Sequence, residues 1–183
     1  LSTPFDIANK GTKITNIGSS ARVDCIDISN DGTKFFTAGS NDTSTLLKVY
    51  ELSTPYDLSS ATEILSSTTA LVVSNPPTCF EFGKNGSRFW YVEGSVMKQY
   101  DLATAYDLTS TKTLSGSITT TQSNGAGDPA FSADGSKLTF GHRGIHILET
   151  GTLTTAYDID TYTQTHTFTT SDNDPSCAKW NAD

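Results

Sequence analysis

A seven-residue pattern recurs four times along the chain and constrains the fold more than any other feature. Its copies begin at Leu1, Leu52, Leu102 and Leu153, and the copy at Leu52 reads LSTPYDL. The successive spacings are 51, 50 and 51 residues. A fixed period of this size is typical of solenoids, propellers and arrays. We therefore interpret residues 1–183 as a single repeat domain or a segment of one.

A second marker follows within the repeats. It is an Asp-Gly or Asn-Gly pair between two short apolar runs, at Asp31-Gly32, Asn85-Gly86 and Asp134-Gly135. Such pairs are strong hairpin signals, because glycine, asparagine and aspartate accept the positive φ angles that a tight turn requires. Each pair is therefore expected to join two adjacent antiparallel strands.

The apolar runs around these markers predict four strands per repeat. The first strands are expected at 23–28, 78–82 and 129–131, and the second at 34–38, 88–92 and 137–140. The third are expected at 46–50, 96–100 and 145–148, and the outer strands at 12–17, 62–66, 111–115 and 162–168. No stretch has helical periodicity, so the sequence predicts an all-β β-propeller with four-stranded antiparallel blades.

In this interpretation the chain holds three complete blades, with an extra outer strand at the N-terminus and an extra inner strand at the C-terminus. The alternatives are a β-sandwich and a β-solenoid. A sandwich does not require four copies of one motif, and solenoid coils are usually much shorter than 50 residues.

The turn segments also carry a family resemblance. Residues 131–140, FSADGSKLTF, resemble the strand-turn-strand signature of the Tol-type and YVTN-type bacterial β-propellers, and residues 28–36 are similar. The linking segments resemble propeller repeats of secreted bacterial and phage-encoded structural proteins. The resemblance covers nearly the whole chain and implies a propeller fold. It implies no catalytic residues, because such families are scaffolds for many functions.

Charge excludes some partners. The net charge of -8 opposes the phosphate backbone, and no lysine or arginine cluster offsets it locally, so nucleic acid is not expected as a partner. No apolar run of about 18 residues is present, so no membrane span is expected. The chain begins at Leu1 without a signal segment, which suggests a removed leader or a piece of a longer protein.

The linking segments and the first strands have expected structural roles. The tyrosines of the pattern, such as Tyr56, are expected between neighbouring blades, and the following aspartates, such as Asp57, are expected to bond the backbone two residues on. Asp27 and Glu81 are expected to face an axial channel or a basic partner such as Lys179.

No catalytic, cofactor-binding or metal-binding residue is predicted. His142 and His146 are four residues apart on a hairpin, where this spacing does not place them on one metal, so outward or edge positions are expected. The oxygen-rich segments 30–32 and 41–42 lack the ligand spacing of a calcium loop. Residues 123–127 are glycine-rich, but no helix or Lys-Ser/Thr pair follows them, so a phosphate site is not expected.

The cysteines and two Asn-x-Ser/Thr sequons also have expected roles. Cys25, Cys79 and Cys177 lie six residues before equivalent turns, so they are interpreted as small apolar fillers of buried strands. Asn41 and Asn85 open Asn-x-Ser/Thr sequons and are the candidate glycosylation sites, with Asn41 expected in a loop.

The regular repeats, the abundance of Ser and Thr and the missing catalytic motif favour a non-enzymatic extracellular structural protein. The expected role is a subunit of a surface filament, appendage or virion, completed by head-to-tail strand exchange with copies of itself. The alternative is a glycan- or receptor-binding adhesin, for which Trp90 and Trp180 are the aromatics to inspect, although core packing explains both. A third alternative is an enzyme whose site gathers residues from loops.

Overall fold

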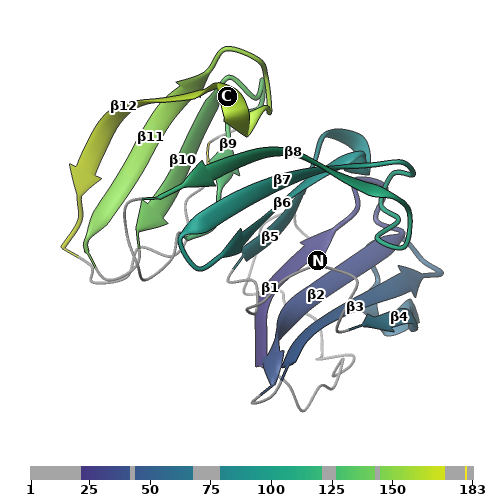
Figure 1. Ribbon diagram of the computed structural model, residues 1–183. Helices are drawn as coiled ribbons and strands as arrows, with labels where there is room; N and C mark the ends of the chain where they lie inside the picture. Colours follow the sequence, from purple (N-terminus) through teal and green to yellow (C-terminus); the bar gives the residue numbers. More distant parts are fainter. Residues whose placement is uncertain are drawn as a thin grey trace, which may run out of the picture.

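A computed structural model describes residues 22–41, 44–67, 79–120, 127–142, 145–171 and Trp180. These residues form three four-stranded antiparallel sheets, one from each repeat (Figure 1). The first sheet contains β1 (Arg22–Ile28), β2 (Lys34–Asn41), β3 (Ser44–Leu52) and β4 (Ala61–Ser67). The second contains β5 (Cys79–Gly83), β6 (Arg88–Glu93), β7 (Val96–Leu102) and β8 (Lys112–Thr119). The third contains β9 (Ala130–Phe131), β10 (Lys137–His142), β11 (Ile147–Leu153) and β12 (Tyr162–Thr169).

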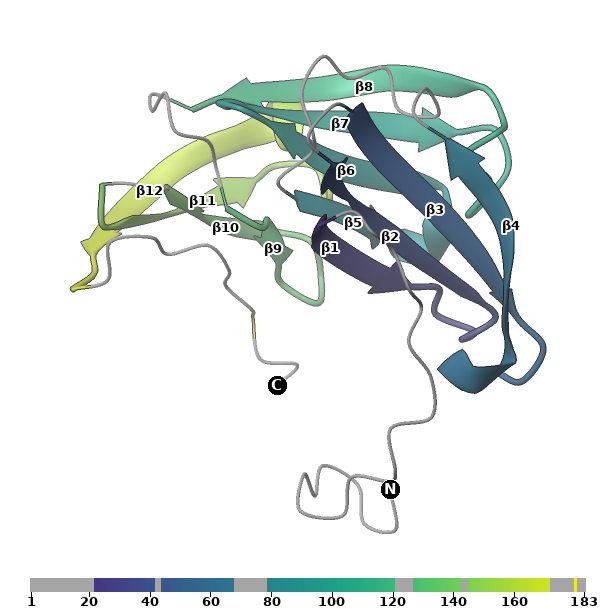
Figure 2. The ribbon, with the colours of Figure 1, turned by 90° about the horizontal axis from the view of Figure 1, so that it is seen from below.

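Each sheet is a simple meander, because its strands pair in chain order. The second sheet lies between the other two, as Figures 1 and 2 both show. This is the blade arrangement of a β-propeller, so the predicted all-β fold with four antiparallel strands per repeat is confirmed. The outer strand expected at 12–17 lies outside the described residues, and of the expected C-terminal inner strand only Trp180 is described.

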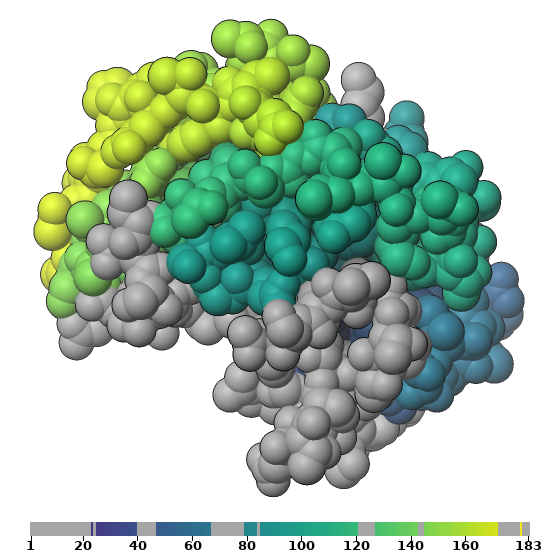
Figure 3. Space-filling view, in the orientation of Figure 1, coloured from purple at the N-terminus to yellow at the C-terminus, as the bar shows by residue number. Residues whose placement is uncertain are grey.

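Two apolar layers hold the sheets together. Between the first and second sheets, Phe36 and Val49 pack with Phe80 and Tyr91. The layer between the second and third sheets includes Cys79, Trp90, Val92, Met97, Leu138, Phe140, Leu153 and Ile159. Figure 3 shows the second repeat, in teal and green, seated against the yellow-green third repeat. Since β6 is covered on both faces, its residues from Phe89 to Val92 are a continuous apolar run without alternation.

The tyrosine of the recurring pattern packs on the glycine of its own repeat's turn. Tyr106 N–H donates to the Gly86 carbonyl at 2.9 Å, and a Cβ on Gly86 would lie 2.3 Å from the Tyr106 ring. The same ring also faces the preceding blade, with its centroid 6.3 Å from that of Phe36. Tyr157 repeats this arrangement against Trp90, also at 6.3 Å. The pattern thus ties the turn, the linker and the neighbouring blade together.

The aspartates of the pattern form the expected turns. The carboxylate of Asp57 accepts from the Ser59 N–H at 2.9 Å, and that of Asp107 accepts from the Thr109 N–H at 2.8 Å. Asp158 accepts from the Asp160 N–H at 3.2 Å. In the first and third repeats this bond caps a single turn of 3-10 helix that precedes the outer strand.

Two other carboxylates, in the hairpin turns, are expected to make stability depend on pH. Ser29 Oγ donates to Asp31 at 2.6 Å and Ser132 Oγ donates to Asp134 at 2.7 Å. These hydrogen bonds are the largest cause that lowers the pKa of each carboxyl from 3.8 to about 2. Because both pKa values are depressed by folding, the stabilisation is present above about pH 4 and is lost as the pH falls toward about 2.

We therefore expect the thermal midpoint to fall between about pH 4 and pH 2, and to fall less steeply in the double variant Asp31→Asn/Asp134→Asn. Asparagine is a matched replacement, since Asn85 occupies the equivalent position of the second repeat. Thermal unfolding followed by circular dichroism across this pH range measures the effect. Identical pH profiles for the two proteins would show that the turn carboxylates do not cause the pH dependence of the thermal midpoint.

Candidate functional site

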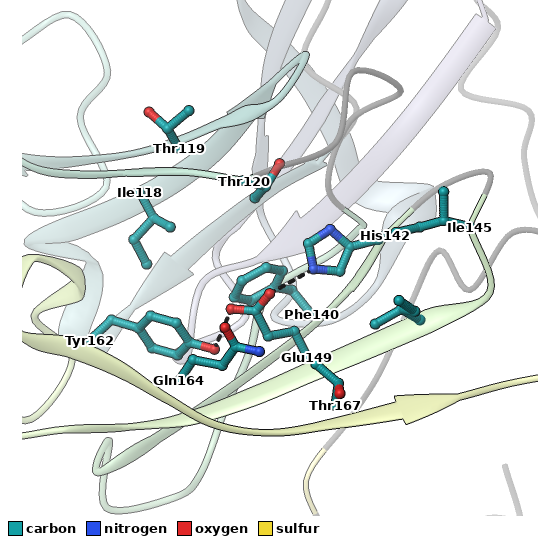
Figure 4. Close-up of a pocket in the computed structure, with 11 residues that line it drawn as sticks. Ile118, Thr119, Thr120, Phe140, His142, Ile145, Glu149, Tyr162, Gln164 and Thr167 are labelled. Carbon is teal, nitrogen blue, oxygen red and sulfur yellow. Dashed lines mark hydrogen bonds and ion pairs between the residues drawn. The ribbon is translucent and has the colours of Figure 1, made fainter.

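The described residues line two hollows with polar groups. One is a groove of about 350 Å³ between the end of β8 and the face of the third sheet. The other, of about 470 Å³, lies along the first strands β1, β5 and β9 of the three sheets. The groove contains a hydrogen-bonded set of His142, Glu149 and Tyr162, and Figure 4 shows its side chains. Its walls are Ile118, Thr119, Thr120, Phe140, His142, Ile145, Ile147, Glu149, Tyr162, Gln164 and Thr167.

His142 is placed in the groove by strand periodicity. It ends β10 two residues after Phe140, so the two side chains share the face that packs toward the second sheet. Only 2% of the residue is exposed. The prediction of an outward or edge position for His142 was therefore wrong, because its side chain is in phase with buried Phe140 and lies on the covered face of the sheet, where it lines the groove.

Glu149 on β11 links two donors across the groove. Its Oε2 lies 2.8 Å from His142 Nε2, and its Oε1 accepts from the Tyr162 hydroxyl at 2.9 Å. Figure 4 shows both side chains converging on this carboxylate. Burial is the largest cause that raises the pKa of Tyr162, followed by its hydrogen bond to Glu149, so the phenol stays a donor. Glu149 is consequently held in one orientation.

The second ring nitrogen of His142 has no hydrogen-bond partner within the described part of the chain. An ionised carboxylate can only accept, so in the neutral ring Nε2 carries the proton and Nδ1 presents a lone pair. This Nδ1 atom is buried and makes no hydrogen bond to any residue that the structure describes. Buried polar atoms are almost always paired, so an orphan acceptor in a groove calls for a donor from outside the protein. The arrangement can accept a hydrogen bond or a proton from a bound molecule.

An exchange of side chains makes the groove specific to the third repeat. Position 151 corresponds to Tyr50 and Tyr100 of the other repeats, which lie two residues before the pattern's leucine. Here it is Gly151, and a Cβ at that position would lie 2.4 Å from the ring of Tyr162. The tyrosine ring thus comes from β12 and not from β11, which brings its hydroxyl to Glu149.

The second hollow is acidic. Asp27, Glu81 and Asp128 line it together with Phe131 and Trp180. Asp27 and Glu81 line this hollow at the first strands. The expectation that they face an axial channel or a basic partner stays a prediction. Asp27 also joins two blades, because its Oδ2 accepts from the Phe82 N–H at 2.6 Å. Lys179 lies outside the described residues. No group of three or more His, Cys, Asp or Glu that could hold a metal ion occurs within the described part of the chain.

The remaining site residues of the sequence lie apart from the groove. Asn41 ends strand β2 opposite Ser44, so the expectation of a loop was wrong at that position. Asn85 is exposed in the second turn with a φ of 63°. Glycosylation of either stays a prediction.

The cysteine and tryptophan predictions have mixed outcomes. Cys25 and Cys79 are buried, as expected, whereas Cys177 lies outside the described residues. Trp90 is buried in the core at 1% exposure, and Trp180 is half-buried with its Nε1 donating to the Ala130 carbonyl at 3.1 Å. Neither tryptophan lines the groove of His142.

His142, Glu149 and Tyr162 are the functional candidates that sequence reasoning missed. The phase of His142 with Leu138 and Phe140 was visible in the sequence and could have predicted burial. The pairing with Glu149 and Tyr162 depends on strand register and was not visible.

Comparison with known proteins shows likeness of fold. No family model matches the chain, and no curated protein matches it. A proposed 6-phosphogluconolactonase from Bacteroides fragilis is similar at 14% identity and a TM-score of 0.53, over 82% of this chain and 42% of that one. The periplasmic gluconolactonase of Pseudomonas aeruginosa is similar at 15% identity and a TM-score of 0.53, over 81% and 41%. A protein from Lactobacillus plantarum is similar at 10% identity and a TM-score of 0.50, over 80% and 41%.

The chain thus spans about two fifths of the length of these structures. They also overturn the predicted function. The prediction of a non-enzymatic extracellular structural subunit, with an adhesin as its alternative, was wrong, because similar structures are described as lactonases and not as structural proteins. These similar structures give no support for a role in a filament, in a virion or in adhesion, or for a glycoprotein. In the part of the chain that the structure covers, no helix is long and apolar enough to cross a membrane.

Proposed function

We propose that this chain is a ligand-binding part of a β-propeller and that it binds a small molecule in the groove lined by His142, Glu149 and Tyr162. The observation that carries the proposal is the buried and unpartnered Nδ1 of His142. The groove volume of about 350 Å³ is in the range of small-molecule sites. Apolar walls with a few converging polar groups are also typical of such sites.

A panel of fragments with neutral, anionic and cationic members tests this proposal. We expect at least one fragment to shift the side-chain resonances of His142 and the backbone amide resonance of Glu149 in the nuclear magnetic resonance spectrum of the whole chain. The Glu149 shift should be lost in His142→Gln and retained in His166→Ala, a matched control because His166 lies exposed on β12. If no fragment of any charge perturbs His142, the groove is not a ligand site.

A second candidate function is hydrolysis of a lactone, an internal ester. The His142–Glu149 hydrogen bond favours it, because a carboxylate that fixes one histidine nitrogen prepares the other as a general base. Two structures of similar fold are also described as lactonases. In this reaction Nδ1 takes a proton from water while the water oxygen bonds to the ester carbonyl carbon. The ring C–O bond then breaks, its oxygen takes up the proton, and the product is a hydroxy acid.

Hydrolysis of D-glucono-1,5-lactone at constant pH tests this candidate against the spontaneous rate. We expect an acceleration that Glu149→Gln reduces by about 100-fold, the size usual for general base catalysis, and that His166→Ala leaves unchanged. A rate equal to the spontaneous one would exclude this candidate for this substrate. The expectation that the chain is not an enzyme is tested by the same assay.

Other expectations stay proposals. We propose that three complete blades are preceded by an extra outer strand and followed by an extra inner strand, as the repeats predict, and that the chain is related to the Tol-type or YVTN-type propellers. An extracellular location and head-to-tail contacts between copies likewise stay predictions.

A further inference from the structure

The groove carries a carboxylate and, among its described lining residues, no lysine or arginine. Glu149 supplies the negative charge. The phenol of Tyr162 and, in its neutral form, the ring of His142 solvate this charge by hydrogen bonds without cancelling it. When the ring of His142 is neutral, a ligand anion would lie beside a carboxylate that has no cationic partner among the described lining residues, and like charges across an interface are costly.

The other two repeats carry a positive charge at the position of Glu149. Glu149 lies four residues before the pattern's leucine, where the first two repeats carry Lys48 and Lys98. Lys48 pairs with Glu63 at 2.7 Å and Lys98 pairs with Glu93 at 2.9 Å. Those positions are neutralised by an ion pair within their own sheet, whereas the third repeat has reversed the sign and leaves a histidine acceptor.

The walls of the groove disfavour a cationic ligand as well. Ile118, Phe140 and Ile147 offer an ammonium group no hydrogen bonds, and transferring a charge onto apolar surface is costly. Each oxygen of Glu149 already has one hydrogen-bond partner, so a ligand ammonium group would share these oxygens with His142 and Tyr162. Hydroxyl groups suit the site better, because they can donate to Nδ1 of His142 and pair with the other polar residues of the wall. These are Thr119, Thr120, Gln164 and Thr167.

We infer that the groove binds an uncharged, hydroxylated small molecule, with one hydroxyl donating to Nδ1 of His142, and that it discriminates against anions. This inference rests on the proposed function and names its ligand class. It separates this site from a site for phosphorylated or carboxylated sugars, since the described lining of the groove has no lysine or arginine to hold such a group.

Three matched probes test the inference: D-sorbitol, D-gluconate and D-glucamine. They share a six-carbon chain and differ at one terminal carbon, which carries a hydroxyl, a carboxylate or an ammonium group. Isothermal titration calorimetry with the whole chain near neutral pH measures each affinity. We expect D-sorbitol to bind, and D-gluconate to bind about tenfold more weakly or worse because of repulsion by Glu149. D-Glucamine is expected to bind more weakly than D-sorbitol.

The variant Glu149→Lys sharpens the test, because it installs the residue that Lys48 and Lys98 provide in the other repeats. We expect it to reverse the preference so that D-gluconate binds more tightly than D-sorbitol. His166→Ala should leave the order unchanged, and circular dichroism checks that each variant is folded.

Equal or tighter binding of D-gluconate by the unaltered chain would overturn the inference, as would a clear preference for D-glucamine. Binding of none of the three would also overturn it. The proposed function would survive all three of these results if another fragment still shifted His142, so the two failures can be told apart.

Discussion

Replacing Trp90 by alanine is expected to lower the free energy of unfolding by about 3–5 kcal/mol, the largest loss we predict for a single substitution. The indole ring lies 4.2 Å, centroid to centroid, from the ring of Phe131 in the next sheet, and only 1% of the residue is exposed. Its Nε1 donates to Gln99 Oε1 at 2.9 Å, and the same oxygen accepts from the Ile159 N–H at 3.0 Å. Alanine would leave a cavity between two sheets. Urea denaturation followed by far-ultraviolet circular dichroism measures the loss.

The matched control is Trp90→Phe. It keeps a ring in the layer and removes the hydrogen bond to Gln99, so we expect a smaller loss of about 1–2 kcal/mol. If Trp90→Ala unfolded with the stability of the unaltered chain, the contact between the second and third sheets would not stabilise the fold as described.

The variant Gly86→Ala is expected to cost about 2–4 kcal/mol, from backbone strain and a steric clash together. Gly86 has a φ of 72°, and its new Cβ would lie 2.3 Å from the ring of Tyr106. The tyrosine cannot withdraw freely, because its own N–H is bonded to the Gly86 carbonyl. The same denaturation experiment measures this loss.

The variant Gly94→Ala separates backbone strain from the steric clash. Gly94 also has a positive φ, of 58°, but a Cβ there would meet nothing within 4 Å. We expect only the strain of about 1–2 kcal/mol. A Gly86→Ala loss no larger than that of Gly94→Ala would contradict the packing of the pattern's tyrosine on the turn.

Much of the fold could be predicted because it repeats. The glycine turns fixed the hairpins, and the strand expected at 34–38 is found as β2, three residues longer. Asp57 and its equivalents follow local backbone rules, so their turns were predictable from adjacent residues. The ends of the strands were harder to predict, because they depend on the pairing partners. For example, β3 extends to Leu52, the first residue of the pattern itself.

The candidate site was not predictable for a physical reason. The site lies where the third repeat differs from the other two, at Gly151, Glu149 and His142. Comparison of the repeats predicts the structure that they share, so it could not predict a site that occurs in one of them. The contacts of His142 with Glu149 and of Tyr162 with Glu149 join three strands, and a register shift between Thr150 and Gly151 helps to set which residues meet. Sequence spacing alone does not supply that alignment.

The protonation state of the His142 ring tests the central claim most directly. Nitrogen-15 spectra of the whole chain without ligand, near neutral pH, report which ring nitrogen carries the proton, with exposed His166 as an internal reference. We predict that Nε2 of His142 is protonated toward Glu149 and that Nδ1 is bare, and that a bound hydroxyl shifts the Nδ1 resonance. A proton on Nδ1, or exchange between both nitrogens as expected for a solvent-exposed histidine, would contradict the account.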